Sequence, residues 1–208
     1  MRFIDFIRHG EPVGGGRYRG QSDDPLSEKG WEQMWVTVGE EAPWQRIVTS
    51  PLQRCSAFAY ALGERHGLAV TEEPDFKEVG FGVWEGRTPQ ELEQEEPGIL
   101  KRFYADPVTQ RPDGAEPLSA FVERVIGAWQ QLARDDASGS TLVVAHAGTI
   151  RAVLMDVLGM RLSHLYRITV PNAGLTRIRL GVLRPPTLLV HGRTSADGAD
   201  RGLGHEKL

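Results

Sequence analysis

Four side chains suited to binding an anion stand just beyond apolar runs of this sequence. They are Arg8, His9, Arg54 and His146. The planar guanidinium group of arginine binds phosphate or carboxylate through two parallel hydrogen bonds. Neutral imidazole is a competent nucleophile near pH 7. If the four side chains meet, they form a concentrated positive site that suits a dianion such as phosphate.

The apolar runs that precede these side chains predict strands of one sheet. The runs are residues 3–7, 47–49 and 141–145. Because helices are expected between them, the pattern indicates a three-layer α/β/α sandwich with a mainly parallel central sheet. Ligands of such sheets bind beyond the carboxyl ends of the strands. Helices that begin at this edge would add amides and dipoles that also attract anions.

Turn and cap patterns predict the remaining elements. We expect helices over residues 28–40, 51–66, 88–95, 98–104, 118–133 and 148–158, and further strands over 68–73, 166–170 and 175–182. Ser27 and Ser50 are the expected N-caps of the first two helices. From residue 184 the chain becomes polar and rich in glycine. We therefore predict one catalytic domain over residues 1–183 and a mobile polar tail over 184–208.

Length and composition fit one globular domain with a sizeable core. The chain has 208 residues, of which 40% are hydrophobic and 25% charged, and its formal net charge is −4. The acidic balance argues against nucleic-acid and anionic-membrane partners. No apolar run reaches the roughly 18 residues of a membrane span, and charged residues interrupt the first apolar stretch. The single cysteine, Cys55, excludes an internal disulfide, so the cytoplasm is the expected location.

A metal site is the main chemical alternative for two converging histidines. Metal sites usually add carboxylates or closely spaced histidine pairs, but neither H-x-x-x-H nor H-x-H occurs here. The arginines would also oppose a cation in the same pocket. We therefore expect neither a metal nor another cofactor. Taken singly, each arginine or histidine is explained as well by an ordinary structural contact, and only their coincidence at three strand ends favours a shared site.

Several blocks of this sequence resemble the histidine phosphatase superfamily, which has the phosphoglycerate-mutase-like fold. The blocks are Arg8-His9-Gly10-Glu11, Asp24-Pro25-Leu26-Ser27-x-x-Gly30, Ser50-Pro51-Leu52-x-Arg54, Glu78-x-Gly80-Phe81-Gly82-x-Trp84-Glu85-Gly86 and His146-Ala147-Gly148. They follow the order of the family between residue 2 and about residue 182. The tripeptide R-H-G is a weak motif alone, but ordered blocks at family-like spacing are a strong one.

The resemblance implies a role for each matching residue. His9 would be the nucleophile that forms a phosphohistidine. The phosphoryl oxygens would be bound by Arg8, Arg54, His146, Ala147 and Gly148. Glu78 would protonate the leaving oxygen and then deprotonate the attacking water. Spacing alone would explain Glu78 better as a solvated loop acid, whereas Glu85 resembles a structural position.

Two segments depart from the family pattern. Many relatives carry an asparagine in the first loop that helps to hold phosphate, and here glycines 14–16 stand in its place. Arg17 or Arg19 is expected either to compensate or to contact the distal part of the substrate. The G-E-S turn of the family is replaced by Ala115-Glu116-Pro117. This replacement leaves the role of the turn open.

The middle of the chain decides between activities within the family. Residues 86–117 are short and acidic and show no clamp for a sugar-acid phosphate. We therefore predict a phosphoric monoester hydrolase of the histidine acid type, acting on a small phosphorylated metabolite. The compact size and residues 166–174 resemble α-ribazole phosphatases, so α-ribazole 5′-phosphate is a candidate substrate beside broad specificity. A cofactor-dependent phosphoglycerate mutase and a non-catalytic phosphate-binding module are the alternatives, and a homodimer stays open.

Overall fold

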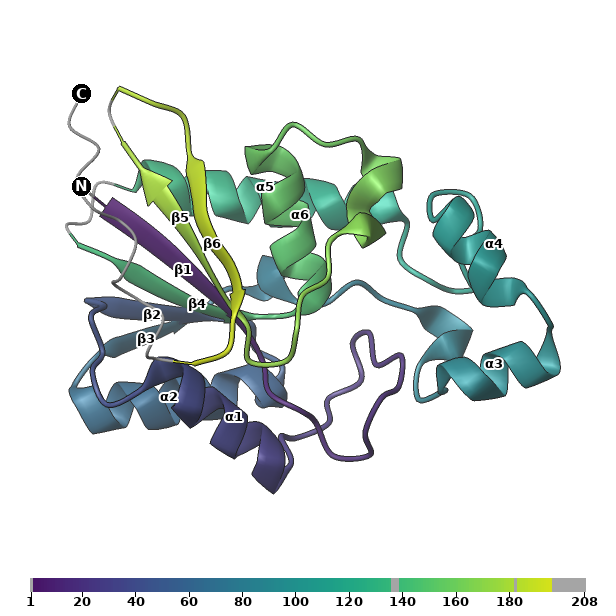
Figure 1. The fold of residues 1–208 in the computed structure, drawn as a ribbon, viewed down its shortest axis with the longest axis horizontal. Coiled ribbons are helices and arrows are strands. Elements are labelled where there is room, and N and C mark those ends of the chain that lie inside the picture. The colour runs from purple at the N-terminus through teal and green to yellow at the C-terminus, as the bar shows by residue number, and fades with distance from the viewer. Residues whose placement is uncertain (1, 136–138, 182, 196–208) are drawn as a thin grey trace.

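A six-stranded sheet runs through the molecule and has helices on both faces (Figure 1). The computed structural model describes residues 2–135, 139–181 and 183–195. The strands are β1 (Arg2–Arg8), β2 (Arg46–Thr49), β3 (Ala69–Glu72), β4 (Thr141–Ala145), β5 (Leu175–Leu180) and β6 (Thr187–Arg193). Their order across the sheet is β3-β2-β4-β1-β5-β6. The first four strands of this order pair in parallel, and β5 and β6 add an antiparallel edge.

The helices divide between the two faces of the sheet and a group beside it (Figure 1). They are α1 (Glu28–Val38), α2 (Gln53–His66), α3 (Pro89–Glu95), α4 (Ile99–Ala105), α5 (Leu118–Arg134) and α6 (Ala147–Val157), with short 3-10 helices η1 (Pro74–Phe76), η2 (Gly82–Trp84) and η3 (Leu162–Arg167). One face carries α1 and α2, the other carries α5 and α6, and α3 and α4 extend beyond the sheet. The predicted α/β/α sandwich is therefore confirmed.

Alternating side chains of the central strands fill two cores, one on each face. In β1, Phe6 packs with the α5 and α6 core while its neighbour Ile7 packs with the α1 and α2 core. In β4, Val143 and Val144 divide in the same way. This period of two explains why apolar residues predominate on both faces of these strands, as expected for strands covered on both sides.

The registers of the central strands bring three strand ends to one edge of the sheet. Arg8 of β1 lies opposite Ala145 of β4, and Thr49 of β2 lies opposite Val144. The residues that follow these strands, among them His9 and His146, therefore leave the sheet side by side. This juxtaposition confirms the geometric prediction that the sequence pattern made.

The C-terminal prediction is wrong in two places. Residues 166–170 do not form a strand, because the chain there completes η3 and then continues as a loop. The tail predicted from residue 184 contains β6, which pairs with β5 and places Leu188 opposite Ile178. The apolar run Leu188-Leu189-Val190 supplies the side chains for this pairing. Residues 196–208 of the predicted tail lie outside the described residues.

The predicted capping of the helices is right for α1 and wrong for α2. Ser27 caps α1, since its hydroxyl accepts a hydrogen bond from the Gly30 amide at 3.0 Å. Helix α2 begins only at Gln53, whose amide donates to the carboxylate of Asp23 at 2.6 Å. Ser50, the expected cap, is instead hydrogen-bonded through its hydroxyl group to the ring of His146. The other predicted helices are found within a few residues of their expected ends.

Within the described ranges, none of the helices combines the length and the apolar character that a membrane crossing requires.

Candidate active site

A cavity of about 380 Å³ opens at the edge where β1 and β4 end. Of the seven predicted site residues, five line it, and they are Arg8, His9, Arg54, Glu78 and Gly148. His146 and Ala147 do not belong to the lining: both are buried, and the ring of His146 lies against that of His9. The cavity is also lined by Arg17, Tyr18, Arg19, Gly20, Val79, Phe81, Tyr104, Arg151 and Tyr166.

His9 follows β1 and is held in one tautomer by the backbone. Its Nδ1 lies 2.7 Å from the carbonyl oxygen of Gly10, and since a carbonyl only accepts, Nδ1 donates. The lone pair of the neutral ring is then on Nε2. Burial, followed by the charges of Arg8 and Arg54, lowers the pKa of His9 well below its usual value. His9 is therefore a neutral imidazole near pH 7, which is the protonation state that a nucleophile needs.

His146 supports His9 from behind. The two rings meet edge to face, with their centroids 5.3 Å apart and their planes at 64°. Nε2 of His146 is 2.7 Å from the hydroxyl oxygen of Ser50. Burial first, and then the charge of Arg54, lowers the pKa of His146 well below its usual value. The structure thus brings the two histidines together, as predicted, with His146 one layer deeper than His9.

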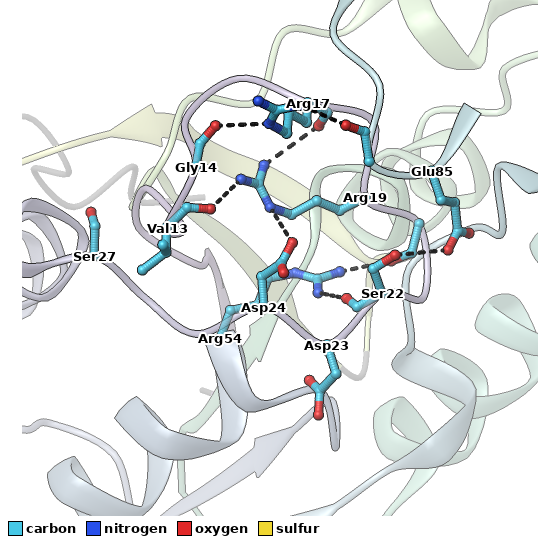
Figure 2. Close-up of polar contacts among 12 residues, drawn as sticks. Val13, Gly14, Arg17, Arg19, Ser22, Asp23, Asp24, Ser27, Arg54 and Glu85 are labelled. Atoms are coloured by element: carbon cyan, nitrogen blue, oxygen red, sulfur yellow. Dashed lines mark hydrogen bonds and ion pairs between the residues drawn. The ribbon is translucent and has the colours of Figure 1, made fainter. Parts of the chain in front are cut away.

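Arg54, at the start of α2, is fixed by the loop that precedes α1. Its Nη1 donates to the carbonyl of Ser22 at 2.5 Å and its Nη2 to that of Gly20 at 2.7 Å. Figure 2 shows the guanidinium group against this loop, whose Ser22 hydroxyl donates to the carboxylate of Glu85 at 3.1 Å. Glu85 also accepts hydrogen bonds from the amides of Gln21 and Phe81. Glu85 is therefore a structural residue that stabilises the loop to which Arg54 donates its hydrogen bonds, in line with the sequence-based interpretation.

Arg8 and Arg54 each keep one buried donor without an acceptor. Among the described residues, the Nε of Arg8 and the Nε of Arg54 have no hydrogen-bond partner, although both atoms are buried. Arg8 donates only its Nη1, to the carbonyl of Val170 at 2.6 Å. Burial lowers the pKa of Arg8 to about 10, against the opposing effect of the Glu78 carboxylate. Buried donors without acceptors are costly, so an anion in the cavity would satisfy both arginines.

Glu78 is placed at the cavity by two backbone amides. Its Oε1 accepts from its neighbour Val79 at 2.9 Å, and its Oε2 accepts from Gly148 in the first turn of α6 at 3.1 Å. Arg124 of α5 holds the backbone behind it by donating to the Lys77 and Glu78 carbonyls at 2.9 and 3.1 Å. These contacts fix a loop that has no regular hydrogen bonds of its own.

The Ala115–Pro117 turn contributes to the same support. Glu116 forms an ion pair with Arg124, with Oε1 and Nε 2.8 Å apart, and its Oε2 accepts from the amide of Gly80 at 3.1 Å. The turn therefore retains a role through its carboxylate, although its neighbours differ from the family pattern. The sequence left this role open because the partners, Gly80 and Arg124, lie in two different segments.

The contact between Glu78 and Gly148 gives a prediction for Gly148→Ala. A Cβ at this position would lie 2.1 Å from Oε1 of Glu78, so the carboxylate must move away. Since displacing a reacting group by about 1 Å can cost about 10²-fold in rate, we expect a loss of this order in kcat for alkyl phosphates. Steady-state kinetics of purified protein would measure it.

Gly127→Ala is the matched control for this substitution. Gly127 lies within α5, and a Cβ there would meet open space. We expect unchanged kinetics and a free energy of unfolding raised by up to about 1 kcal/mol, because alanine favours the helix. Unchanged kinetics of Gly148→Ala would show that the position of the Glu78 carboxylate has no importance for turnover.

Arg17 and Arg19 both line the cavity but differ in how many of their guanidinium nitrogens already donate hydrogen bonds (Figure 2). Arg19 is buried, and its guanidinium group pairs with Asp24 at 3.0 Å and donates to the Val13 carbonyl at 2.6 Å. Arg17 donates Nε to the Gly14 carbonyl at 3.1 Å and Nη1 to the Gly86 carbonyl at 2.7 Å. Arg19 thus stabilises its own loop, whereas Arg17 keeps Nη2 for other contacts.

Four further lining residues were missed by the sequence reasoning. They are Arg151 and the tyrosines 18, 104 and 166. For Arg151 a pattern was present, because it follows Gly148 by three residues in a predicted helix and so shares its face. The tyrosines come from three separate segments, and no local pattern relates them.

Within the described parts of the chain, no three histidine, cysteine, aspartate or glutamate side chains gather closely enough to hold a metal ion.

Comparisons with known proteins agree with this fold. The model of the histidine phosphatase superfamily (branch 1) matches residues 4–189. Phosphoserine phosphatase 1 of Hydrogenobacter thermophilus is 29% identical over 84% of each chain, and the probable phosphoglycerate mutase GpmB of Klebsiella pneumoniae is 29% identical over 86% of this chain and 85% of its own. The structure of mycobacterial glucosyl-3-phosphoglycerate phosphatase Rv2419c is similar with a TM-score of 0.81, at 26% identity and covering 94% of this chain and all of that one.

Proposed function

Because this chain belongs to the histidine phosphatase superfamily, we propose that it is a phosphomonoesterase that acts through a phosphohistidine on His9. The observation that supports this most directly is the pair of buried arginine Nε donors without acceptors. They belong to the two arginines that line one cavity with a neutral histidine and a carboxylate. A phosphoryl group would supply acceptors to both arginines while its phosphorus faces His9.

In the first half-reaction, Nε2 of His9 attacks phosphorus in line with the ester bond. The bond from phosphorus to the ester oxygen breaks, and protonated Glu78 gives its proton to that oxygen. Arg8 and Arg54 stabilise the charge on the equatorial oxygens, which is the main demand of phosphoryl transfer. His146, which lies behind His9, would hold the ring of His9 in position through their edge-to-face contact.

In the second half-reaction, water attacks the phosphohistidine. The Glu78 carboxylate takes a proton from this water, the bond between phosphorus and Nε2 breaks, and inorganic phosphate leaves. Glu78 is then protonated again and His9 neutral, so the cycle closes. The amides of Val79 and Gly148 hold the carboxylate in place for both steps.

We propose that the reaction needs no metal, because the arginines that line the cavity oppose a cation there. The test is hydrolysis of p-nitrophenyl phosphate in the presence of excess EDTA. We expect full turnover, with a phosphoenzyme trapped by rapid denaturation at alkaline pH and located on His9 by mass spectrometry. Activity that depends on an added divalent cation would contradict the mechanism, and absence of hydrolysis would favour the non-catalytic phosphate-binding module.

The mutase is the second candidate, favoured by the similarity to the probable phosphoglycerate mutase GpmB. Both activities share the first half-reaction, so they differ in whether the phosphohistidine passes its phosphoryl group to water or to a second phosphoglycerate. Interconversion of phosphoglycerates that is stimulated by bisphosphoglycerate and faster than hydrolysis would identify a mutase.

For the substrate we propose a small phosphorylated metabolite in the cytoplasm, with neither nucleic acid nor membrane as a partner. α-Ribazole 5′-phosphate is one candidate, supported by the resemblance of residues 166–174. Phosphoserine is another, by analogy with the relative from Hydrogenobacter thermophilus.

A further inference from the structure

Arg151 presents a fixed guanidinium group to the cavity. It lies on α6 one turn after Gly148, and both residues line the cavity. Its Nε donates to the carbonyl of Ile168 at 2.8 Å, and its guanidinium carbon lies 5.4 Å from the centre of the Tyr166 ring. The hydroxyl of Tyr166 accepts in turn from Arg111 at 3.4 Å. Arg151 is thus oriented from two sides before any substrate binds.

The terminal nitrogens of Arg151 remain available. Within the described parts of the chain, neither of them has a hydrogen-bond partner, and Arg151 pairs with no carboxylate there. By contrast, Arg19 is paired with Asp24, and Arg17 has Glu91 within 3.8 Å. Among the described residues, Glu78 is the only one that lines the cavity with a carboxylate. Arg151 is therefore a cation without a counterion at a site rich in positive charge.

Arg151 lies beside Arg8, along one stretch of backbone. Arg8 donates to the carbonyl of Val170, and Arg151 donates to that of Ile168, two residues earlier. The two guanidinium groups lie near each other, because the charge of Arg151 is among the causes that lower the pKa of Arg8. Because Arg151 and Arg8 are held by different carbonyls and both line the cavity, Arg151 is placed to bind a neighbouring group of a small molecule whose phosphoryl group Arg8 binds.

From this geometry we propose that Arg151 binds a second anionic group, so that the preferred substrate is a phosphomonoester with a carboxylate a few bonds from the ester oxygen. The inference rests on the proposed function, because Arg8 and Arg54 are taken to bind the phosphoryl group. A guanidinium group with two free terminal nitrogens matches the two oxygens of a carboxylate. A second phosphate would offer the same acceptors, and α-ribazole 5′-phosphate has no second anion.

The test compares substrates that differ only in this group. O-phospho-L-serine and O-phosphoethanolamine share the phosphate and the ammonium group, and only the first has a carboxylate. We expect the wild-type enzyme to prefer phosphoserine by about 10- to 100-fold in kcat/KM, as for a charge-assisted hydrogen-bonded pair. Arg151→Met should reduce this ratio to near one, and Arg151→Lys, which keeps the charge but not the fork, should give an intermediate ratio.

A second pair of substrates separates carboxylate from phosphate. Ethylene glycol bisphosphate and ethylene glycol monophosphate differ by one phosphate, and a preference for the bisphosphate larger than that for phosphoserine would overturn the choice of a carboxylate. The control variant is Arg167→Met, because Arg167 is exposed and does not line the cavity. Its ratios should equal those of the wild type.

The outcomes separate this inference from the proposed function. Hydrolysis of p-nitrophenyl phosphate without any preference for phosphoserine would overturn the inference alone. A uniform loss in Arg151→Met, with the ratio unchanged, would mean that Arg151 binds the reacting phosphoryl group, which also overturns it. Failure of the wild type to hydrolyse any phosphomonoester would overturn both. The wild-type ratio needs no substitution, so the inference stays testable if Arg151→Met does not fold.

Discussion

His9→Ala is expected to abolish turnover, with kcat lower by about 10⁴-fold or more, as for the loss of a covalent nucleophile. Alanine offers no lone pair to phosphorus, so no phosphoenzyme forms. The neighbouring arginines remain, and the variant should still bind inorganic phosphate. The measurement is release of p-nitrophenol together with mass spectrometry of the trapped protein. Near-normal activity, or a phosphoenzyme in this variant, would refute the assignment of His9.

The fold of this variant can be checked independently. His9 contributes one side-chain hydrogen bond to a neighbouring carbonyl and one ring contact to His146. We therefore expect the circular dichroism spectrum to be retained. His164→Ala, in η3 and outside the cavity lining, is the matched control and should keep wild-type kinetics.

Glu78→Gln is expected to slow the enzyme in a manner that depends on the leaving group. An alkoxide needs a proton as it departs, whereas p-nitrophenolate departs readily without one. We expect kcat/KM to fall by about 10²- to 10⁴-fold for alkyl phosphates, the usual range for general acid catalysis, and by less than about tenfold for p-nitrophenyl phosphate. The measurement uses a series of phosphomonoesters with leaving groups of increasing pKa. We expect the plot of log kcat/KM against leaving-group pKa to be steeper for the variant than for the wild type.

Equal slowing of all esters by this substitution would mean that Glu78 is not the proton donor. The amide of glutamine also presents one donor where Glu78 accepts from Val79 and Gly148, so part of any uniform loss would reflect displacement. Glu64→Gln is the matched control, since Glu64 is exposed on α2 away from the cavity. It should behave as the wild type with every ester.

The central sheet could be predicted from the sequence because its information is local. Strands β1 and β4 are mostly apolar, and Gly67 ends α2 in the left-handed conformation that glycine favours. Strand β6 was missed because it lies in a polar, glycine-rich segment, where edge pairing with β5 outweighs composition. Residues 166–170 show an apolar alternation typical of a strand, but they complete η3 and continue as a loop, because tertiary contacts override the local preference.

The candidate site likewise contains residues that a local sequence pattern predicts and residues that it does not. Arg8, His9 and Arg54 follow recognisable strands, so the rule for parallel sheets was enough to bring them together. Glu78 sits in a loop whose geometry depends on Gly148 and Arg124, 70 and 46 residues away, and only the family resemblance pointed to it. Side chains that reach the cavity from distant segments leave no periodic pattern in a single sequence.

The hydrogen bonds of Glu85 to the loop beneath Arg54 have a consequence for how the substrate specificity of this protein can change in evolution. Residues 78–86 carry Glu78, the proposed acid, at one end and, near the other, the Glu85 carboxylate that anchors the loop beneath Arg54. An insertion or deletion in this stretch would disturb proton transfer and anion capture together, so no intermediate variant retains one without the other. New specificity is therefore expected at cavity-lining residues that the proposed chemistry does not use, such as Arg151 of α6.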